Sequence, residues 1–306
     1  MDGSLIIDKP EGITSHTVVA RVRRVAGTRR VGHAGTLDPF ATGVLVVCVG
    51  RGTRLSQFLV GLDKEYVATI RLGFATDTQD LTGKQITPLE SSYNRGLEGL
   101  CSVLDDFRGP QMQTPPMFSA KKVAGERLYR AARAGRVVER QPVAINVYSI
   151  DLIEDGMNPR ALNEDGTRDF VVRVRCSSGT YVRTLAHDIG ERLGAGGHLA
   201  ALRRTAVGSF AVSRAIGLEE LERAGSQAVD SCLIGMAETV AHLPAVELDA
   251  DAVKAVTNGR EIELSSEAAF EPDAVVRILD RAGGLVAVGD FDKARGVVKP
   301  RVVVYS

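Results

Sequence analysis

The chain has 306 residues, of which 44% are hydrophobic and 25% charged, and its formal net charge is zero. This composition is normal for a soluble globular protein with a sizeable core, and a neutral chain has no overall attraction for nucleic acid. The N-terminus, MDGSLIIDKPEG, combines acidic residues with a three-residue apolar run and predicts neither a secretory signal nor a membrane span. We therefore expect a cytoplasmic protein without membrane association.

The cysteine pattern does not indicate a metal site. The four cysteines lie far apart and mostly inside apolar runs, at Cys48, Cys101, Cys176 and Cys232. No CxxC motif or Cys/His cluster has the spacing of zinc ligands. We expect buried free thiols and no bound metal.

The charges are unevenly distributed along this neutral chain. Glu219–Asp273 holds thirteen acidic and three basic residues, so the remainder carries a net charge of +10. Between Glu11 and Asp38 there is no acidic residue, but there are five arginines suited to binding phosphates, namely Arg21, Arg23, Arg24, Arg29 and Arg30. A solvated helix face would explain the same arginines equally well.

Two elements are predicted before the central loop of the sequence. Leu5–Ile7 is an apolar run that reads as a short strand. A helix is predicted from an N-cap at Thr14 or Ser15 to about Val25, closed by Gly27.

The stretch Val31–Val49, VGHAGTLDPFATGVLVVCV, is a glycine-punctuated polar loop that leads into an apolar strand over Val44–Val49. Pro39 restricts the preceding Asp38 to extended backbone, so the carboxylate can be aimed, and the glycines allow a ligand to come close. An Asp-Pro dipeptide alone is more often part of a structural turn. Both a structural and a functional Asp38 therefore stay open on local sequence.

The middle of the chain alternates predicted strands and helices. Strands are predicted at 63–73, Val143–Ile153 and Phe170–Cys176, with a disordered or variable excursion at 154–168 between the last two. A helix is predicted within 91–109 and is followed by a proline-rich loop.

A second strong helix is predicted after an N-cap at Ser178 or Thr180. Arg183 falls in its first turn, where a cation opposes the helix dipole and calls for a compensating anion. The apolar stripe of this helix is Val182, Leu185, Ala186, Ile189 and Leu193.

The end of the chain has a different rhythm. A helix is predicted at Leu218–Ala224, and a second domain is predicted to start near Pro244 with a short helix at Asp249–Val256. Alternating strands follow in VVRILD, GLVAVGDF and VVKPRVVVY, separated by glycine-containing turns.

Several of these segments resemble one family in the same order. GHAGTLDPFATGVL resembles the signature of the TruB family, the bacterial synthases that convert uridine 55 of tRNA to pseudouridine. KPEGITS resembles the opening motif of that family, and SGTYVRTL resembles a later one. Residues 244–306, with KPRVVV near their end, resemble the small β-barrel RNA-binding PUA module. The resemblance implies an isomerase that uses no cofactor.

The resemblance implies catalytic roles for three residues. Asp38 matches the essential catalytic residue, and Arg183 matches an arginine that pairs with it and favours its ionised form. Tyr66 matches a tyrosine that stacks on the target base and is a candidate acceptor of the C5 proton. Whether Asp38 attacks C1′ or C6, or removes the 2′ proton to give a glycal, stays open.

Four further residues match positions that bind the substrate or support the loop. Tyr181 and Leu202 match residues of the uridine pocket, and Lys9 matches a lysine that supports the catalytic loop. His33 matches a residue that fills the space left by the flipped uridine. On local sequence alone, a core role for Leu202 fits equally well, a surface lysine at a turn is favoured for Lys9, and a lone loop histidine such as His33 is more often a solvated or capping residue.

Residues 110–142 resemble the mobile thumb with which the family grips RNA, although Phe118 replaces the usual Tyr. Between Lys121 and Arg140 the sequence has seven basic residues and two acidic ones, a density of positive charge suited to binding phosphates. The expected phosphate contacts are Lys121, Lys122, Arg127 and Arg130.

We expect an α+β fold with a mixed, mostly antiparallel sheet flanked by helices over residues 1–243 and a PUA-like β-barrel over residues 244–306. The expected partner is tRNA, bound through its T-loop and T-stem by a monomer without an obligate protein partner. Two other function classes stay open. One is an RNA-binding tRNA-folding factor with secondary or no catalysis, and the other is a guide-RNA-dependent synthase with partner proteins.

Overall fold

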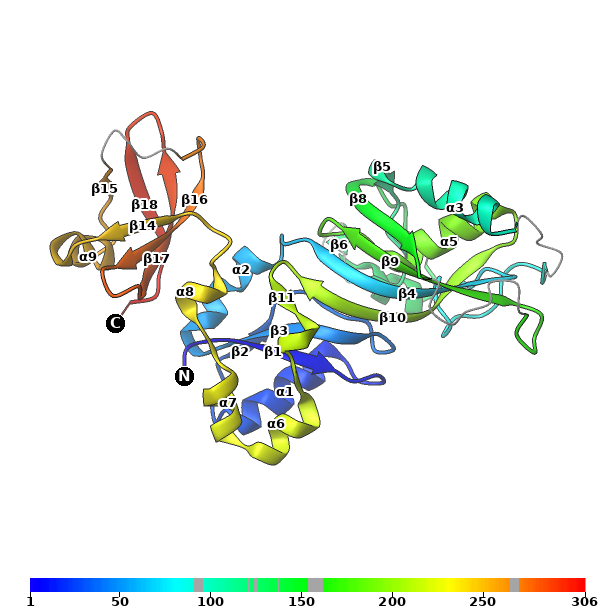
Figure 1. The fold of residues 1–306 in the computed structure, drawn as a ribbon, viewed down its shortest axis with the longest axis horizontal. Helices are drawn as coiled ribbons and strands as arrows, with labels where there is room; N and C mark the ends of the chain where they lie inside the picture. The colour runs from blue at the N-terminus through cyan, green and yellow to red at the C-terminus, as the bar shows by residue number, and fades with distance from the viewer. Residues whose placement is uncertain are drawn as a thin grey trace. The chain divides into compact units, whose positions relative to one another are not determined.

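The computed structural model describes residues 1–90, 96–119, 122–123, 126–136, 138–153, 162–264 and 270–305. The chain forms two compact units. The first unit comprises Met1–Pro39, Gly43–Gly61 and Gly208–Ser306, and the second unit comprises Phe40–Thr42 and Leu62–Val207. Figure 1 labels most of their helices and strands. Among the described residues, no helix is long and apolar enough to cross a membrane.

The first unit is built around strand β1 (Gly3–Lys9). It pairs antiparallel with β3 (Thr42–Val49), and β2 (Val31–His33) also pairs antiparallel with β3. Two short strands flank β1: β12 (Ile216–Gly217) runs parallel to it and β13 (Ile234–Gly235) antiparallel. This part of the sheet is therefore mixed and mostly antiparallel, as the sequence predicts.

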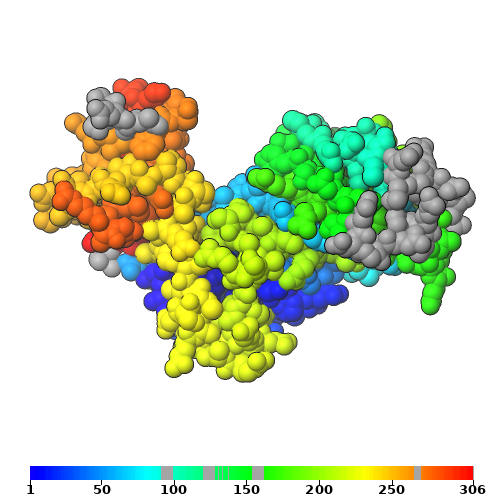
Figure 2. All heavy atoms as spheres, viewed as in Figure 1, coloured from blue at the N-terminus to red at the C-terminus, as the bar shows by residue number. Residues whose placement is uncertain are grey.

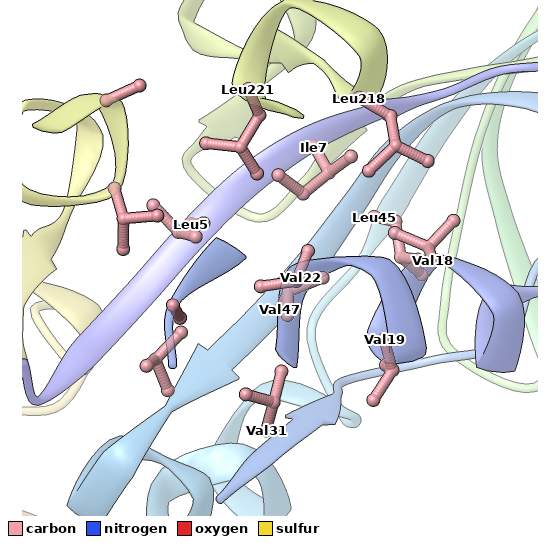
Figure 3. Packing of buried hydrophobic residues seen from close by; sticks show 14 residues of the cluster. Leu5, Ile7, Val18, Val19, Val22, Val31, Leu45, Val47, Leu218 and Leu221 are labelled. Atoms are coloured by element: carbon pink, nitrogen blue, oxygen red, sulfur yellow. The ribbon is translucent and has the colours of Figure 1, made fainter. Parts of the chain in front are cut away.

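Three helices cover these strands: α1 (Ser15–Val25), α6 (Leu218–Ala224) and α7 (Ser226–Cys232). The bounds of α1 and α6 confirm the predicted helices. Figure 2 shows the yellow atoms of the α6–α7 segment lying over blue atoms of the N-terminal segment. In Figure 3 the apolar side chains of these helices and strands point toward one another, including Leu5, Ile7, Val18, Val22, Leu45, Val47, Leu218 and Leu221.

The C-terminal part of the first unit is a separate five-stranded sheet in the order β14-β16-β17-β18-β15. Its core also contains side chains of helix α9 (Ala250–Thr257), which begins one residue after the predicted position. The strands are β14 (Ala245–Leu248), β15 (Ile262–Glu263), β16 (Val275–Asp280), β17 (Leu285–Asp292) and β18 (Val297–Val303).

This small sheet is joined to the rest of the first unit by a second apolar cluster. Leu279 and Val302 of the sheet pack with Leu55 of η1 (Gly50–Leu55) and with Val240, which follows α8 (Met236–Thr239). Arg51 adds polar contacts, because it donates to the Val304 carbonyl at 2.9 Å and pairs with Asp2 at 2.9 Å. A domain boundary at residue 244 stays a prediction.

The second unit contains an antiparallel sheet in the order β10-β4-β9-β8-β5. Helix α5 (Val182–Leu193) packs against β10 and β4, and α3 (Gly96–Asp106) packs against α5 and β8. The strands are β4 (Lys64–Leu72), β5 (Gly109–Gln113), β8 (Val143–Leu152), β9 (Arg168–Cys176) and β10 (Gly197–Val207).

The fold class predicted from the sequence is confirmed, but several strands were not predicted, among them β2, β5 and the long strand β10. Strand β5 lies where the sequence predicts a proline-rich loop. Pro110 cannot donate a ladder hydrogen bond, but β5 is the terminal strand in the order of the second unit's sheet, where proline is tolerated. Of the predicted excursion at 154–168, residues 154–161 lie outside the described residues, and in the remainder Thr167 bonds to Asn163 and Asp165.

The prediction of buried thiols is only half right. Cys48 and Cys176 are buried, and burial raises their pKa values to about 12 and about 11. Cys101 is exposed on α3, and Cys232 is half-buried at the end of α7. The apolar run around Cys101 forms a helix that has one side in solvent, and Cys101 lies on that side. The composition of the run alone does not tell which of its residues are exposed.

Candidate active site

Asp38 lies in an irregular segment after β2, followed by a turn at residues 39–40, and its side chain is half-buried. The residues on both sides of it are held by the first unit's own backbone and side chains. Leu37 is bonded to Ser15 at the start of α1, and the Pro39 carbonyl accepts from the Gly12 backbone at 2.8 Å. The loop around the carboxylate is therefore fixed to the segment between β1 and α1.

Lys9, the last residue of β1, supports this loop directly. It is fully buried, and its ammonium donates to the carbonyls of Pro10 at 2.8 Å and Pro39 at 3.1 Å. A lysine is rarely buried without such partners, so the alternative of a surface lysine is wrong. A positive charge thus lies beside the residue that follows Asp38.

His33 ends β2 opposite Val47 of β3. Its half-buried ring meets the ring of His16, the second residue of α1, edge-on, with centroids 5.4 Å apart and planes at 72°. His33 is therefore not a solvated loop histidine, since it ends a strand and packs against another ring. Its role toward a flipped base stays a prediction.

Tyr66 and Leu202 share one face of the second unit's sheet. Tyr66 of β4 lies opposite Arg204 of β10, and Leu202 of β10 lies opposite Ala68 of β4. Residues opposite each other in neighbouring strands project to the same side, so all four side chains lie on one face. All four side chains are buried. The sheet therefore brings two of the predicted pocket residues together.

Tyr181 is the N-cap residue of α5, with extended backbone at φ −97° and ψ 105° and no side-chain cap. The predicted N-caps, Ser178 and Thr180, are wrong. The backbone is still non-helical at Tyr181, so the helix begins only at Val182. Buried Gln113 of β5 instead clips the Tyr181 backbone, accepting from its N–H at 2.8 Å and donating to its carbonyl at 3.1 Å. Sequence analysis did not identify Gln113.

Arg183 is buried in the first turn of α5 and bonds to three groups of the second unit. It pairs with the buried carboxylate of Asp80 at 3.4 Å and donates to the Thr78 carbonyl at 3.1 Å and the Phe118 carbonyl at 2.8 Å. Asp80 is thus a compensating anion of the kind that the helix dipole calls for. The pairing of Arg183 with Asp38 stays a prediction.

Asp80 was missed because its segment, ATDTQDLTGK, has only the composition of a polar turn. Its carboxylate accepts from the hydroxyls of Thr78 at 2.7 Å and Thr82 at 2.6 Å, and from the Thr82 backbone at 3.0 Å. The preceding Gln79 has φ 62°, a left-handed conformation that costs energy in residues with a side chain. Threonines two residues on either side of an aspartate were the available signal for such a turn.

Lys64 is a further buried cation on the face that carries Tyr66. Its ammonium donates to the Leu62 carbonyl at 2.6 Å. Burial, followed by the nearby positive charge of Arg204, lowers the pKa of Lys64 from 10.5 to about 8. The folded protein therefore releases this proton more easily than the unfolded chain does.

We expect Lys64 to make stability rise with pH between about 8 and 10.5, because the unfolded chain binds more protons there than the folded protein. Lys64→Met removes this contribution. The free energy of unfolding, from urea titrations across the interval, should therefore increase with pH more steeply in the wild type than in Lys64→Met. An equal slope for the two proteins would contradict burial of the charged group.

The five N-terminal arginines have different surroundings. Arg21 pairs with Glu222 of α6, and Arg23 donates to the Val31 carbonyl at 2.8 Å. Arg24, whose side chain is 76% exposed, is 3.8 Å from the same glutamate, and Arg29 and Arg30 are exposed. Arg21 is thus half-buried in an ion pair, whereas Arg24, Arg29 and Arg30 face solvent, as does Arg23 despite its bond to the Val31 carbonyl.

Little of the predicted thumb can be assigned to contacts. Lys121 lies outside the described residues, as do the side chains of Lys122, Arg127 and Arg130. The described backbone contains the short pair β6 (Lys122–Val123) and β7 (Glu126–Arg127), followed by α4 (Leu128–Arg133). Phosphate binding by these residues stays a prediction.

Comparisons with known proteins identify the family. The profile described as TruB family pseudouridylate synthase (N terminal domain) matches residues 23–182. The profile described as tRNA pseudouridylate synthase B C-terminal domain matches residues 183–240.

Two relatives named tRNA pseudouridine synthase B span almost the whole chain. The protein from Solibacter usitatus is 40% identical, over 95% of this chain and 96% of its own length. The protein from Thermobifida fusca is 45% identical, over 91% of this chain and 94% of its own length.

A solved structure described as a Cbf5-Nop10-Gar1 complex has a similar fold, with a TM-score of 0.75 and 28% identity. The match covers 98% of this chain and 84% of that chain. It confirms the predicted pseudouridine synthase fold. Together with the profile matches and the two relatives, it places the chain in the TruB family of pseudouridylate synthases, which are isomerases.

Proposed function

We propose that this isomerase converts uridine 55 in the T-loop of tRNA to pseudouridine, with Asp38 as the essential carboxylate. The relatives that span the chain are named for tRNA. The observation that carries the proposal is the geometry of the GHAGTLDPFATGVL segment. It holds Asp38 in a non-helical loop whose two neighbours are bonded to the buried side chains of Ser15 and Lys9.

The reaction sets three requirements. The bond from C1′ to N1 breaks, the base rotates, the bond from C1′ to C5 forms, and the C5 proton leaves while N1 gains one. The site therefore needs a carboxylate, a clamp for the loose base and an acceptor for the C5 proton. We assign these roles to Asp38, to Tyr181 with Leu202, and to Tyr66.

Tyr66→Phe should bind tRNA normally and lose most product formation, because phenylalanine keeps the stacking ring but lacks the hydroxyl that accepts the proton. Single-turnover release of tritium from C5-labelled tRNA measures this step. Tyr148→Phe is the matched control, since Tyr148 is exposed on β8 and donates to Asp63 at 3.1 Å. Normal turnover by Tyr66→Phe would leave Tyr66 a stacking role only.

Uridine 55 is buried in the folded T-loop and has to be flipped out, at a cost of a few kcal/mol. His33 lies three residues beyond Arg30, at the end of the strand that Val31 begins. The exposed arginines and the histidine therefore follow each other along the chain. We propose that the arginines hold the RNA backbone while His33 occupies the vacated space.

Replacing Arg24, Arg29 and Arg30 together with Gln should flatten the salt dependence of tRNA affinity. Each lost phosphate contact reduces the slope of log K against log salt by about 0.7 to 0.9, so three contacts correspond to a change of about two units or slightly more. The rate at saturating tRNA should be unchanged. Arg21→Gln is the control, since Arg21 is half-buried and paired with Glu222. A wild-type slope in the triple variant would contradict phosphate binding by these arginines and would indicate that the thumb segment binds the RNA backbone instead.

We further propose that the chain acts as a monomer without a protein partner or guide RNA, although the matching Cbf5 structure is a complex with Nop10 and Gar1. Site selection has its own test. Purified protein should release tritium from a transcript with uridine at position 55. It should release none from a transcript with cytidine at position 55 and labelled uridines elsewhere. Release from this second transcript would contradict the proposal that uridine 55 is the target.

A further inference from the structure

Ser15 bonds to both backbone groups of the residue that precedes Asp38. Its hydroxyl oxygen accepts from the Leu37 N–H at 2.9 Å and donates to the Leu37 carbonyl at 3.1 Å. Both residues are almost fully buried, Ser15 at 2% and Leu37 at 4% exposure. An adjacent β-strand would supply the same pair of bonds to a residue, so one hydroxyl here replaces a strand partner.

This hydroxyl is not needed to cap the helix. Thr14 is the N-cap of α1, with extended backbone, and its side chain accepts from the Thr17 N–H at 3.0 Å. Neighbouring hydroxyls thus have separate tasks. Thr14 stabilises the start of the helix, whereas Ser15 points at the loop.

The opposite side of Asp38 is held from the same segment. Pro39 has no N–H, and its carbonyl accepts from the Lys9 ammonium at 3.1 Å and from the Gly12 N–H at 2.8 Å. Residues 9–15 therefore fix the backbone on both sides of Asp38, by Ser15 before it and by Lys9 and Gly12 after it.

We propose that Ser15 is a positioning residue for Asp38, an inference that rests on the proposed catalytic role of Asp38. It acts by fixing the Leu37 peptide groups and hence the direction of the next side chain. Without the hydroxyl, two buried backbone groups lose their partner, and the loop has to move to reach water or another donor. A displacement of about 1 Å at a reacting group lowers a rate by about 100-fold.

The matched variants Ser15→Ala and Thr14→Ala separate positioning from stability. Ser15→Ala should lower the single-turnover rate of tritium release by about 10- to 100-fold with unchanged tRNA affinity. Thr14→Ala loses the helix cap and should lower Tm by a few degrees at an unchanged rate. Ser15→Cys fills the same space with a weak hydrogen-bonding group and should behave like Ser15→Ala, which excludes an effect of the cavity.

The outcomes distinguish this inference from the proposed function. If wild-type protein turns over and Ser15→Ala matches its rate, the positioning role is wrong. It is also wrong if Ser15→Ala and Thr14→Ala lose rate equally for an equal fall in Tm, since stability would then explain both. Absence of turnover by the wild-type protein would instead contradict the proposed function.

Discussion

Asp38→Asn is expected to bind tRNA with wild-type affinity and to release no tritium from it. Asparagine has nearly the same shape, and the bonds that hold the loop go to the backbone of Leu37 and Pro39, so they survive the change. The variant loses the negative charge that the reaction needs, whether Asp38 attacks C1′, attacks C6 or removes the 2′ proton. Filter binding and single-turnover tritium release measure the two properties separately.

A surface carboxylate gives the matched control. Asp105 of α3 is exposed and forms an ion pair at 3.0 Å with Arg108, which follows the helix. Asp105→Asn makes the same chemical change and should turn over like the wild type, because exposed ion pairs contribute little. Appreciable turnover by Asp38→Asn would refute the assignment of the catalytic carboxylate.

The second large effect is expected for Arg183→Lys. The guanidinium reaches Asp80, Thr78 and Phe118 with two of its nitrogens, whereas a lysine ammonium is a single point that cannot span the three acceptors. We expect the single-turnover rate to fall by about 100-fold or more, as for the loss of an oriented charged donor in a buried site. Affinity for tRNA should change little, because the side chain is buried.

The same variant should lose stability. Buried acceptors left without a donor cost about 1 to 3 kcal/mol each at most, so the unfolding free energy should fall by an amount of this order. Arg192→Lys is the control on the same helix, since Arg192 pairs with Asp106 at 3.0 Å on the exposed surface. A wild-type rate for Arg183→Lys would show that charge alone suffices and that the planar contacts have no part in the reaction.

The sequence predicts helices and strands best where the apolar pattern is regular. The helix at Leu218–Ala224 and the stripe of α5 were found because one side of each is buried. Strand β5 and the start of α5 were not, since Pro110 reads as a loop residue and Ser178 reads as a cap. Both depend on tertiary structure. Strand β5 tolerates proline because it is last in its sheet, and the bonds from Gln113 hold the backbone of Tyr181 at the start of α5.

The site was predicted through motif similarity, and the residues missed were those that act on backbone or on other side chains. Asp80 is marked only by the threonines two residues on either side of it, and Ser15 only by its place at the end of the KPEGITS motif. Their importance depends on which groups they meet, and those groups are distant in sequence: Arg183 for Asp80, and Leu37 for Ser15. The same limit applies to Arg21, whose partner Glu222 lies on α6.

The most direct test of the central claim is tritium release from C5-labelled tRNA transcript by the purified protein, with no other protein or RNA present. Our account predicts release from one uridine per tRNA at a rate that saturates with protein concentration. Tight binding of the transcript without any release would contradict it, and would indicate an RNA-binding tRNA-folding factor in place of a synthase.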